Sequence, residues 1–302
     1  MLPFLSAVFL SLLLSTSSAN AAERLLFEEG FEDTSWPSRG WYGDPQIATT
    51  NEESFSGSRS CVWHWEKVGD IKPPGFGGRA KFGSVDNVTL SFQMKHSRSW
   101  QWTGVRWHPH EFLFMTNIDD DFMGPAYTHL TFYVEVVNGI PRVAIQDARN
   151  IDESRVGENR VGENLVSVTE NRSVAGCNGD SDGYGDGDCY RSGKVHRNGK
   201  HWEPPGVFFS DVWGDYDKTM WHELKSRIVF NTIEDGVGQK DGIIQMWYDD
   251  TLIMDHHDVV FRTGQHPDLR IDKFLMLPYM DPKAKTSQKI WIDDIRITTE
   301  DP

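Results

Sequence analysis

Short runs of alternating polar and apolar residues, separated by Gly, Pro, Asn and Asp, recur along this chain of 302 residues. Alternation with a period of two is typical of a strand that buries one face, and the 3.6-residue period of a helix is nearly absent. Many short strands joined by turns are typical of an all-β sandwich or jelly roll. The predicted strands lie within residues 24–31, 59–66, 88–95, 104–116, 128–137, 140–147, 221–231, 242–254, 271–279 and 289–299.

Two local patterns sharpen this prediction. Asn138-Gly139 separates two of the runs and predicts a hairpin with a two-residue type I′ turn, in which both central residues have positive φ. Leu90, Phe92 and Met94 alternate along another run, so we expect them to face the core.

The two ends of the sequence indicate how the chain is organised. Residues 1–22 are apolar from Leu2 to Leu14 and end in Ala19-Asn20-Ala21-Ala22, which predicts a secretory signal peptide. We therefore expect export to the extracellular space or the periplasm. Residues 23–302 are predicted to form one jelly-roll domain with a long loop insertion at about 148–215. The protein is expected to be a monomer. No later segment reaches the ~20 apolar residues of a membrane span, so no membrane insertion is expected.

The charge balance limits the class of partner. Lys and Arg number 30 against 45 Asp and Glu, a formal net charge of −15. A protein this acidic is a poor non-specific ligand for nucleic acid or anionic membranes. It can bind an acidic polymer only through a local basic cleft.

The three cysteines suggest different roles. Cys177 and Cys189 flank a short acidic loop, and in an exported protein they predict a disulfide. Cys61 alternates with Trp63 and Trp65, so a buried, inert thiol is the expectation.

The loop between the paired cysteines has oxygen ligands at alternating positions and Gly183 at a sharp turn. This arrangement is typical of the start of a calcium-binding loop, although Cys189 stands where a bidentate Glu would be expected. The alternative is an acidic disulfide loop without metal. The predicted calcium ligands are Asn178, Asp180, Asp182 and Asp186.

The scaffold resembles exported carbohydrate-active proteins with the concanavalin-A-like jelly roll, and within them polysaccharide lyases of the glucuronan and alginate type. The resembling segments are residues 26–33, 221–231, 241–249 and 291–297. The E-x-D-x-x-E strand of the related β-glucanases and the R-[ST]-E-[LV] signature of one alginate lyase family are absent. The resemblance implies a calcium ion that Asp293 shares with Glu32 or Glu28, and alternation places Asp293 on one face with Trp291, Ile295 and Ile297.

A polar face on the runs 221–231 and 242–254 is the first candidate site. Cleavage next to a uronic carboxylate requires cations or amides that neutralise it, together with a base and an acid. Arg227 and Lys225 suit the first role, and Gln146 is a further candidate for it. A solvated pair of surface charges is the alternative. The substrate-binding candidates on this face are Glu223, Gln245 and Trp247, with Asn231 on the same side.

Proton transfer has several candidates elsewhere in the sequence. Tyr133, Tyr279 and His110 are the candidate bases, and Trp107 offers a ring on which a sugar can stack. Alternation places His110 with Arg106 and His108, opposite Trp107 and Glu111. Histidines with a purely structural role are the alternative.

Together these features predict a protein that binds an acidic polysaccharide and a lyase that cleaves uronate-containing glycans by β-elimination. The alternative is a non-catalytic carbohydrate-binding or adhesive module of the laminin-G-like type.

Overall fold

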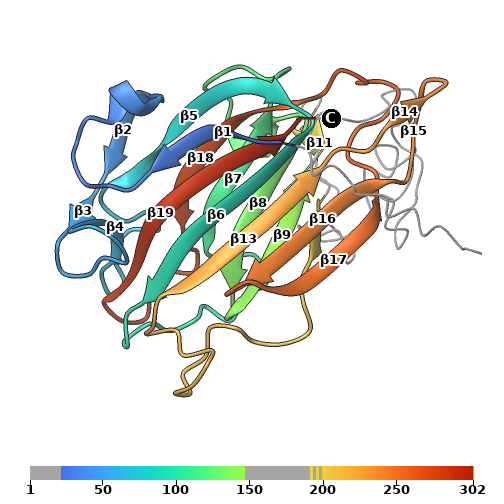
Figure 1. Ribbon diagram of the computed structural model, residues 1–302. Helices are drawn as coiled ribbons and strands as arrows, with labels where there is room; N and C mark the ends of the chain where they lie inside the picture. Colours follow the sequence, from blue (N-terminus) through green and yellow to red (C-terminus); the bar gives the residue numbers. More distant parts are fainter. Residues whose placement is uncertain (1–21, 147–190, 193–194, 197–198, 302) are drawn as a thin grey trace, which may run out of the picture.

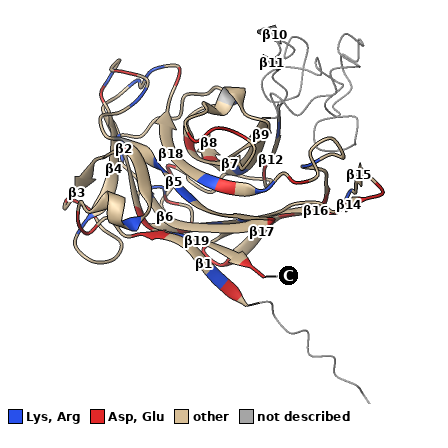
Figure 2. Cartoon of the chain, turned by 90° about the horizontal axis from the view of Figure 1, so that it is seen from above, with Lys and Arg blue, Asp and Glu red and all other residues tan. Residues whose placement is uncertain are grey.

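Two large antiparallel sheets packed face to face form the molecule, and the sequence prediction of an all-β jelly-roll sandwich is confirmed (Figures 1 and 2). The computed structural model describes residues 22–146, 191–192, 195–196 and 199–301. Sheet A has the order β17 (Thr251–Val259), β16 (Gly242–Tyr248), β13 (His222–Val229), β6 (Asn87–His96), β19 (Gln288–Glu300), β4 (Ser60–Trp65) and β3 (Thr49–Thr50), and β1 (Glu23–Glu29) also pairs with β19.

Sheet B carries the site described below. Its order is β12 (Gly199–Trp202), β9 (Ile140–Gln146), β8 (Thr131–Val137), β7 (His110–Thr116), β18 (Ile271–Tyr279), β5 (Phe76–Val85) and β2 (Trp41–Ile47). Small elements complete the described part of the chain: the hairpins β10 (Arg191–Ser192) with β11 (Val195–His196) and β14 (Ile233–Glu234) with β15 (Val237–Gly238), and the 3₁₀ turns η1 (Trp36–Arg39) and η2 (Pro125–Tyr127).

The core lies between the sheets and follows the predicted alternation. Leu90, Phe92 and Met94 are buried in it, as expected. Cys61 is a free, fully buried cysteine in the same core, so its predicted burial is confirmed, and burial raises the pKa of its thiol. Removing so many large apolar side chains from water is the main stabilising term, about 1.5–3 kcal/mol for each fully buried one.

The Asn138-Gly139 turn is confirmed. β8 ends at Val137, β9 begins at Ile140, and the two turn residues have φ values of 54° and 81°. Both values are positive, as a type I′ turn requires. This turn sets the register in which Tyr133 lies opposite Ala144.

Two details of sheet A differ from the prediction. β13 ends at Val229, and Asn231 is fully buried beyond it, where its amide bonds the backbone of Phe261 and Arg262. It is therefore not on the polar face.

β19 has a bulge, since the step of three residues from Asp293 to Arg296 lies opposite a step of two residues on β6, and Asp294 has a φ of 47°. Asp293 consequently faces away from the core, whereas Ile295 and Ile297 face into it. The expectation that Asp293 shares a face with Ile295 and Ile297 is therefore wrong.

Candidate functional site

A cavity of about 500 Å³ lies on the face of sheet B that is turned away from sheet A. On this face Leu113, Met115, Tyr133 and Leu275 form an apolar cluster separate from the core between the sheets. The cavity extends over β7, β8, β9, β12 and β18, beside loops that contribute Lys72, Trp107, His108 and Pro125. Five of the sequence candidates line it: His110, Tyr133, Gln146, Tyr279 and Trp107.

His110 belongs to a charged network at the floor of the cavity. Its Nδ1 lies 2.7 Å from Glu135 Oε2, and Glu135 Oε1 accepts hydrogen bonds of 2.8 and 2.6 Å from Arg142. Burial acts to raise the pKa of Glu135, but the Arg142 charge and the His110 contact outweigh it and the pKa is lowered. An ionised Glu135 makes His110 Nδ1 the donor and leaves Nε2 as the basic nitrogen.

Tyr133 and Gln146 flank this histidine. The Tyr133 hydroxyl donates to Gln146 Oε1 at 2.9 Å, which leaves the amide NH₂ of Gln146 to donate elsewhere. The Tyr133 ring centre lies 4.7 Å from that of His110, and the ring of Tyr279 stacks on His110 at 6.1 Å. An imidazole, two phenols and an amide therefore meet within one cavity.

His108 lies beside His110, with ring centres 4.8 Å apart. Its Nδ1 donates to the carbonyl of Asp281. Burial lowers its pKa from 6.5 to about 4, with a smaller contribution from His110, so His108 is neutral at pH 7.

The predicted strand at 104–116 begins only at His110. Because residues 104–109 are a loop, Trp107 and His108 line the same cavity, and the expectation that they face opposite sides is wrong. Glu111 is the residue that points away, since its buried carboxyl accepts a hydrogen bond from the Val136 amide.

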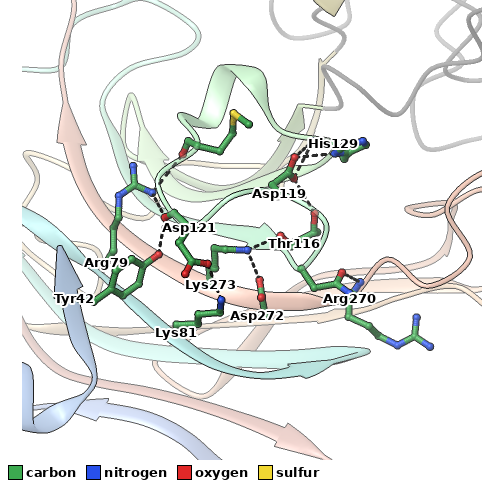
Figure 3. A network of polar contacts seen from close by, with 12 residues as sticks. Tyr42, Arg79, Lys81, Thr116, Asp119, Asp121, His129, Arg270, Asp272 and Lys273 are labelled. Carbon is green, nitrogen blue, oxygen red and sulfur yellow. Dashed lines mark hydrogen bonds and ion pairs between the residues drawn. The ribbon is translucent and has the colours of Figure 1, made fainter.

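The loop between β7 and β8 forms a wall of the cavity through Pro125. Polar contacts pin it across sheet B (Figure 3): Asp121 accepts from Lys81 at 2.6 Å through its carboxylate and from Tyr42 at 2.8 Å through its carbonyl. At the base of the loop, Asp119 accepts hydrogen bonds from the backbone and ring of His129. These contacts hold one side of the cavity in place.

The polar face predicted on residues 221–231 and 242–254 lies on sheet A and not at this cavity. Lys225, Arg227, Glu223, Gln245 and Trp247 are on β13 and β16 of sheet A, on the face turned away from the core. Arg227 pairs with Glu300 at 2.7 Å and donates to Gln245 at 3.1 Å, and Lys225 lies over the Trp247 ring at 5.1 Å. The two predicted groups thus sit on different sheets and do not form one groove.

Glu32 and Asp293, the implied calcium ligands, hold one loop. Glu32 accepts hydrogen bonds from the Ser58 and Arg59 amides, and Asp293 accepts from Phe55 and Ser56. Burial raises the pKa of Asp293 to about 6. Glu28 instead lies 3.8 Å from Arg296.

Among the residues that the structure describes, no group of three His, Cys, Asp or Glu side chains could hold a metal ion. The predicted disulfide Cys177–Cys189, the calcium loop with Asn178, Asp180, Asp182 and Asp186, and the signal peptide lie outside the described residues. The described part of the chain also contains no helix long and apolar enough to cross a membrane.

Sequence reasoning missed several residues of the cavity, among them Arg142, Lys200, His201 and Lys72. Arg142 carried a signal, because it alternates with Ala144 and Gln146 on one strand. Lys200 and His201 did not, since β12 joins β9 across more than fifty residues of sequence.

The solved structures to which this chain is similar include polysaccharide lyases. The endo-β-1,4-glucuronan lyase of the fungus Trichoderma reesei is 12% identical, with 91% of this chain and 96% of that chain covered and a TM-score of 0.50. The alginate lyase vAL-1 from Chlorella virus is 13% identical over 84% and 89% of the two chains, with a TM-score of 0.47. The alginate lyase of Aplysia kurodai is 12% identical over 93% and 99%, with a TM-score of 0.48.

No family model and no curated protein matches the sequence. At these identities the likeness concerns the fold. The resemblance predicted from the sequence is confirmed at that level: this chain has the jelly-roll fold found in a glucuronan lyase.

Proposed function

We propose that this protein is an exported polysaccharide lyase that cleaves a uronate-containing glycan by β-elimination in the cavity of sheet B. The observation that carries the proposal is the meeting of His110, Tyr133 and Gln146 in one cavity, with His110 oriented by the ionised Glu135. The structural likeness to lyases supports it at the level of the fold. Export rests on the signal-like residues 1–22.

The base of the reaction is His110. With Nδ1 donating to Glu135, Nε2 accepts the proton from C5 of the uronate unit. The electrons of the C5–H bond form the C4=C5 double bond while the C4–O bond to the next sugar breaks. The negative charge of Glu135 stabilises the imidazolium that results.

The acid is Tyr133. Its hydroxyl is 2.9 Å from Gln146 and its ring lies against His110, so it can protonate the leaving oxygen on the same side of the sugar.

The carboxylate of the substrate is stabilised by Gln146 and Lys200. The Gln146 NH₂ can donate to the substrate carboxylate, because the amide oxygen is the atom that accepts from Tyr133. Lys200 lines the cavity on β12, over the Trp202 ring at 5.4 Å. Lys225 and Arg227, the sequence candidates for this role, lie on sheet A and take no part in the proposed reaction.

The test is to incubate the protein with glucuronan, alginate and pectate and to follow the ultraviolet absorbance of unsaturated chain ends. Tyr133→Phe and His110→Gln should each lower kcat by roughly 10²–10⁴-fold, the range of a lost general acid or base. Arg227→Gln on sheet A is the matched control and should retain activity. Binding of these glycans without any unsaturated product would instead identify a non-catalytic carbohydrate-binding module.

A further inference from the structure

A second cavity lies at one end of the sandwich, between the turn that joins β16 to β17 and the loop of residues 203–221, which joins β12 to β13. Its volume is about 630 Å³, within the range of about 300–1,000 Å³ that is typical of small-molecule sites. The loop protrudes at the lower edge of Figure 1. This cavity shares no lining residue with the cavity of sheet B, so the lyase proposal makes no use of it.

Aromatic rings form much of the wall of this cavity. Phe208, Tyr216 and Tyr248 meet with ring centres between 5.1 and 5.6 Å apart. Trp221 also lines the cavity, and its ring meets that of Phe55 edge-on at 6.1 Å. Because Phe208 and Tyr248 are buried, the core supports the more exposed ring of Tyr216. Rings held in this way offer a flat apolar surface at a low cost in conformational entropy.

The apolar surface continues from the cavity onto the outside of the loop. Tyr216 and Met220 line the cavity and are 45% and 55% exposed. Trp213, beside the lining residue Gly214, is 88% exposed. Exposed apolar side chains that gather in one place mark an interaction site. A stable protein interface uses about 20–30 residues on each side, whereas these side chains come from one short loop, so a small ligand unit fits them better.

The backbone of this loop is held in place by its own contacts. The Ser210 amide donates to the Tyr216 carbonyl at 2.7 Å, and the Ser210 carbonyl accepts from the Lys218 amide at 3.1 Å. The buried Lys218 ammonium donates to the Trp100 carbonyl at 2.6 Å and pairs with Asp211. The loop therefore presents its rings before a ligand arrives, which lowers the cost of binding.

The charged groups of the cavity are hydrogen-bond acceptors. Asp215 and Asp249 line it, and neither Lys nor Arg is among the described residues that do so. The Asp249 carboxylate accepts from the His222 ring and from the Glu223 amide, each at 2.8 Å, and its oxygens keep lone pairs for further donors. Sugar hydroxyls can donate to these carboxylates, whereas the carboxylate of a uronate is repelled by them.

We propose that this cavity binds a neutral polysaccharide, whose pyranose rings stack on its tyrosine and tryptophan rings and whose hydroxyls donate to Asp215 and Asp249. The stacking rings are Tyr216 and Trp221, and the neighbouring Trp213 extends the aromatic surface. The C–H groups on one face of a pyranose are apolar and slightly positive, which suits the negative face of an aromatic ring. The site is additional to the cavity of sheet B and takes no part in cleavage.

The test measures binding of the full-length protein to soluble xylan, mannan, β-1,3-glucan and hydroxyethyl cellulose by affinity electrophoresis. Tyr216→Ala should weaken binding to the polymer that is retained by about tenfold, the loss typical of an aromatic hot spot. Trp213→Ala should weaken it less, by roughly threefold, because this ring only extends the surface. Tyr216→Phe should bind nearly as well as the wild type, since it keeps the ring. Arg227→Gln, outside the cavity, should change nothing, and thermal unfolding should show that each variant is folded.

The inference is overturned if none of the neutral polymers binds, or if Tyr216→Ala and Trp213→Ala both bind like the wild type. Asp215→Asn should retain most of the binding, because an amide oxygen still accepts hydrogen bonds. Binding of polylysine that is lost in Asp215→Asn and in salt, without binding of any neutral polymer, would identify a cationic partner instead. A dimer in sedimentation that Trp213→Ala abolishes would identify a second copy of the chain as the occupant.

This inference and the lyase proposal fail separately. Trp213→Ala should cleave soluble polyuronates as fast as the wild type, since the two cavities share no residue. Neutral-polymer binding that weakens in Tyr216→Ala supports the second site even if no polyuronate is cleaved. Cleavage without any neutral-polymer binding refutes the second site and leaves the lyase proposal intact.

Discussion

The buried His108 makes the stability of the fold depend on pH. Its folded-state pKa of about 4 lies below the ordinary 6.5, so the unfolded chain binds more protons between these values. Its neutral form therefore favours folding fully above pH 6.5, and this contribution is lost as pH falls toward 4. The loss is about 3 kcal/mol at most. Denaturant unfolding at pH 7 and pH 5 should show wild type losing more stability than His108→Gln, and equal losses would contradict this.

Glu135 is expected to affect both stability and catalysis. Glu135→Gln leaves the buried Arg142 without its carboxylate, and a broken buried pair costs about 3–5 kcal/mol. The matched control is Glu300→Gln, which removes a carboxylate from the more exposed Arg227 and should cost only about 0–1 kcal/mol. Urea unfolding measures both.

A kinetic readout distinguishes orientation of His110 from stability alone. Glu135→Gln should lower kcat and shift its pH profile at temperatures where the variant is still folded, because the imidazole loses the carboxylate that fixes its tautomer. An unchanged pH profile would show that Glu135 has only a structural role.

For single residues, the sequence could predict which of them lie on one face of a strand, but not which of them meet in one cavity. Alternation and residue type selected His110, Tyr133 and Gln146, which the structure brings together. The same reasoning selected Lys225 and Arg227, which lie on sheet A. Period two states which face of a strand is polar, but it does not state to which of the two sheets that strand belongs.

Among the elements, β5 shows how tertiary packing overrides local preference. Its glycines argue against a strand, yet a side chain at Gly77 would meet the Met276 carbonyl at 2.2 Å, and one at Gly78 would meet the Trp41 ring at 2.9 Å. The glycines are needed because neighbouring strands approach closely. The bulge in β19 also depends on tertiary structure, because it is visible only in the pairing with β6.

The loop between β7 and β8 leads to a prediction about a whole element. Asp119 is buried and accepts from the His129 backbone, the His129 ring and the Thr116 hydroxyl, whereas Asp121 pairs with Lys81 near the surface. Asp119→Ala should cost about 1–3 kcal/mol because buried donors lose their acceptor. It should also raise KM, since the cavity wall loosens. Asp121→Asn should cost less than about 1 kcal/mol. Equal effects of the two substitutions in unfolding experiments would contradict this account.

For the whole molecule, the fold class followed from the sequence because strand alternation and turn residues recur on both sides of the predicted insertion at about 148–215. The site did not, because it depends on pairings such as β12 with β9 that join distant segments. Although the protein is acidic, three cations line the cavity of sheet B: Lys72, Arg142 and Lys200.

The net charge of −15 predicts an unusual response to salt. At 0.01 M ionic strength the Debye length is about 30 Å, so an anionic polymer is repelled by the charge of the whole protein. At 0.15 M the Debye length is about 8 Å, and the polymer then interacts mainly with the cations that line the cavity of sheet B. We expect kcat/KM for an acidic polymer to rise severalfold between these conditions, because repulsion slows association. Steady-state rates at constant pH measure this dependence. A steady fall of kcat/KM with salt would show that attraction by the cations of the cavity outweighs repulsion by the net charge even at low ionic strength.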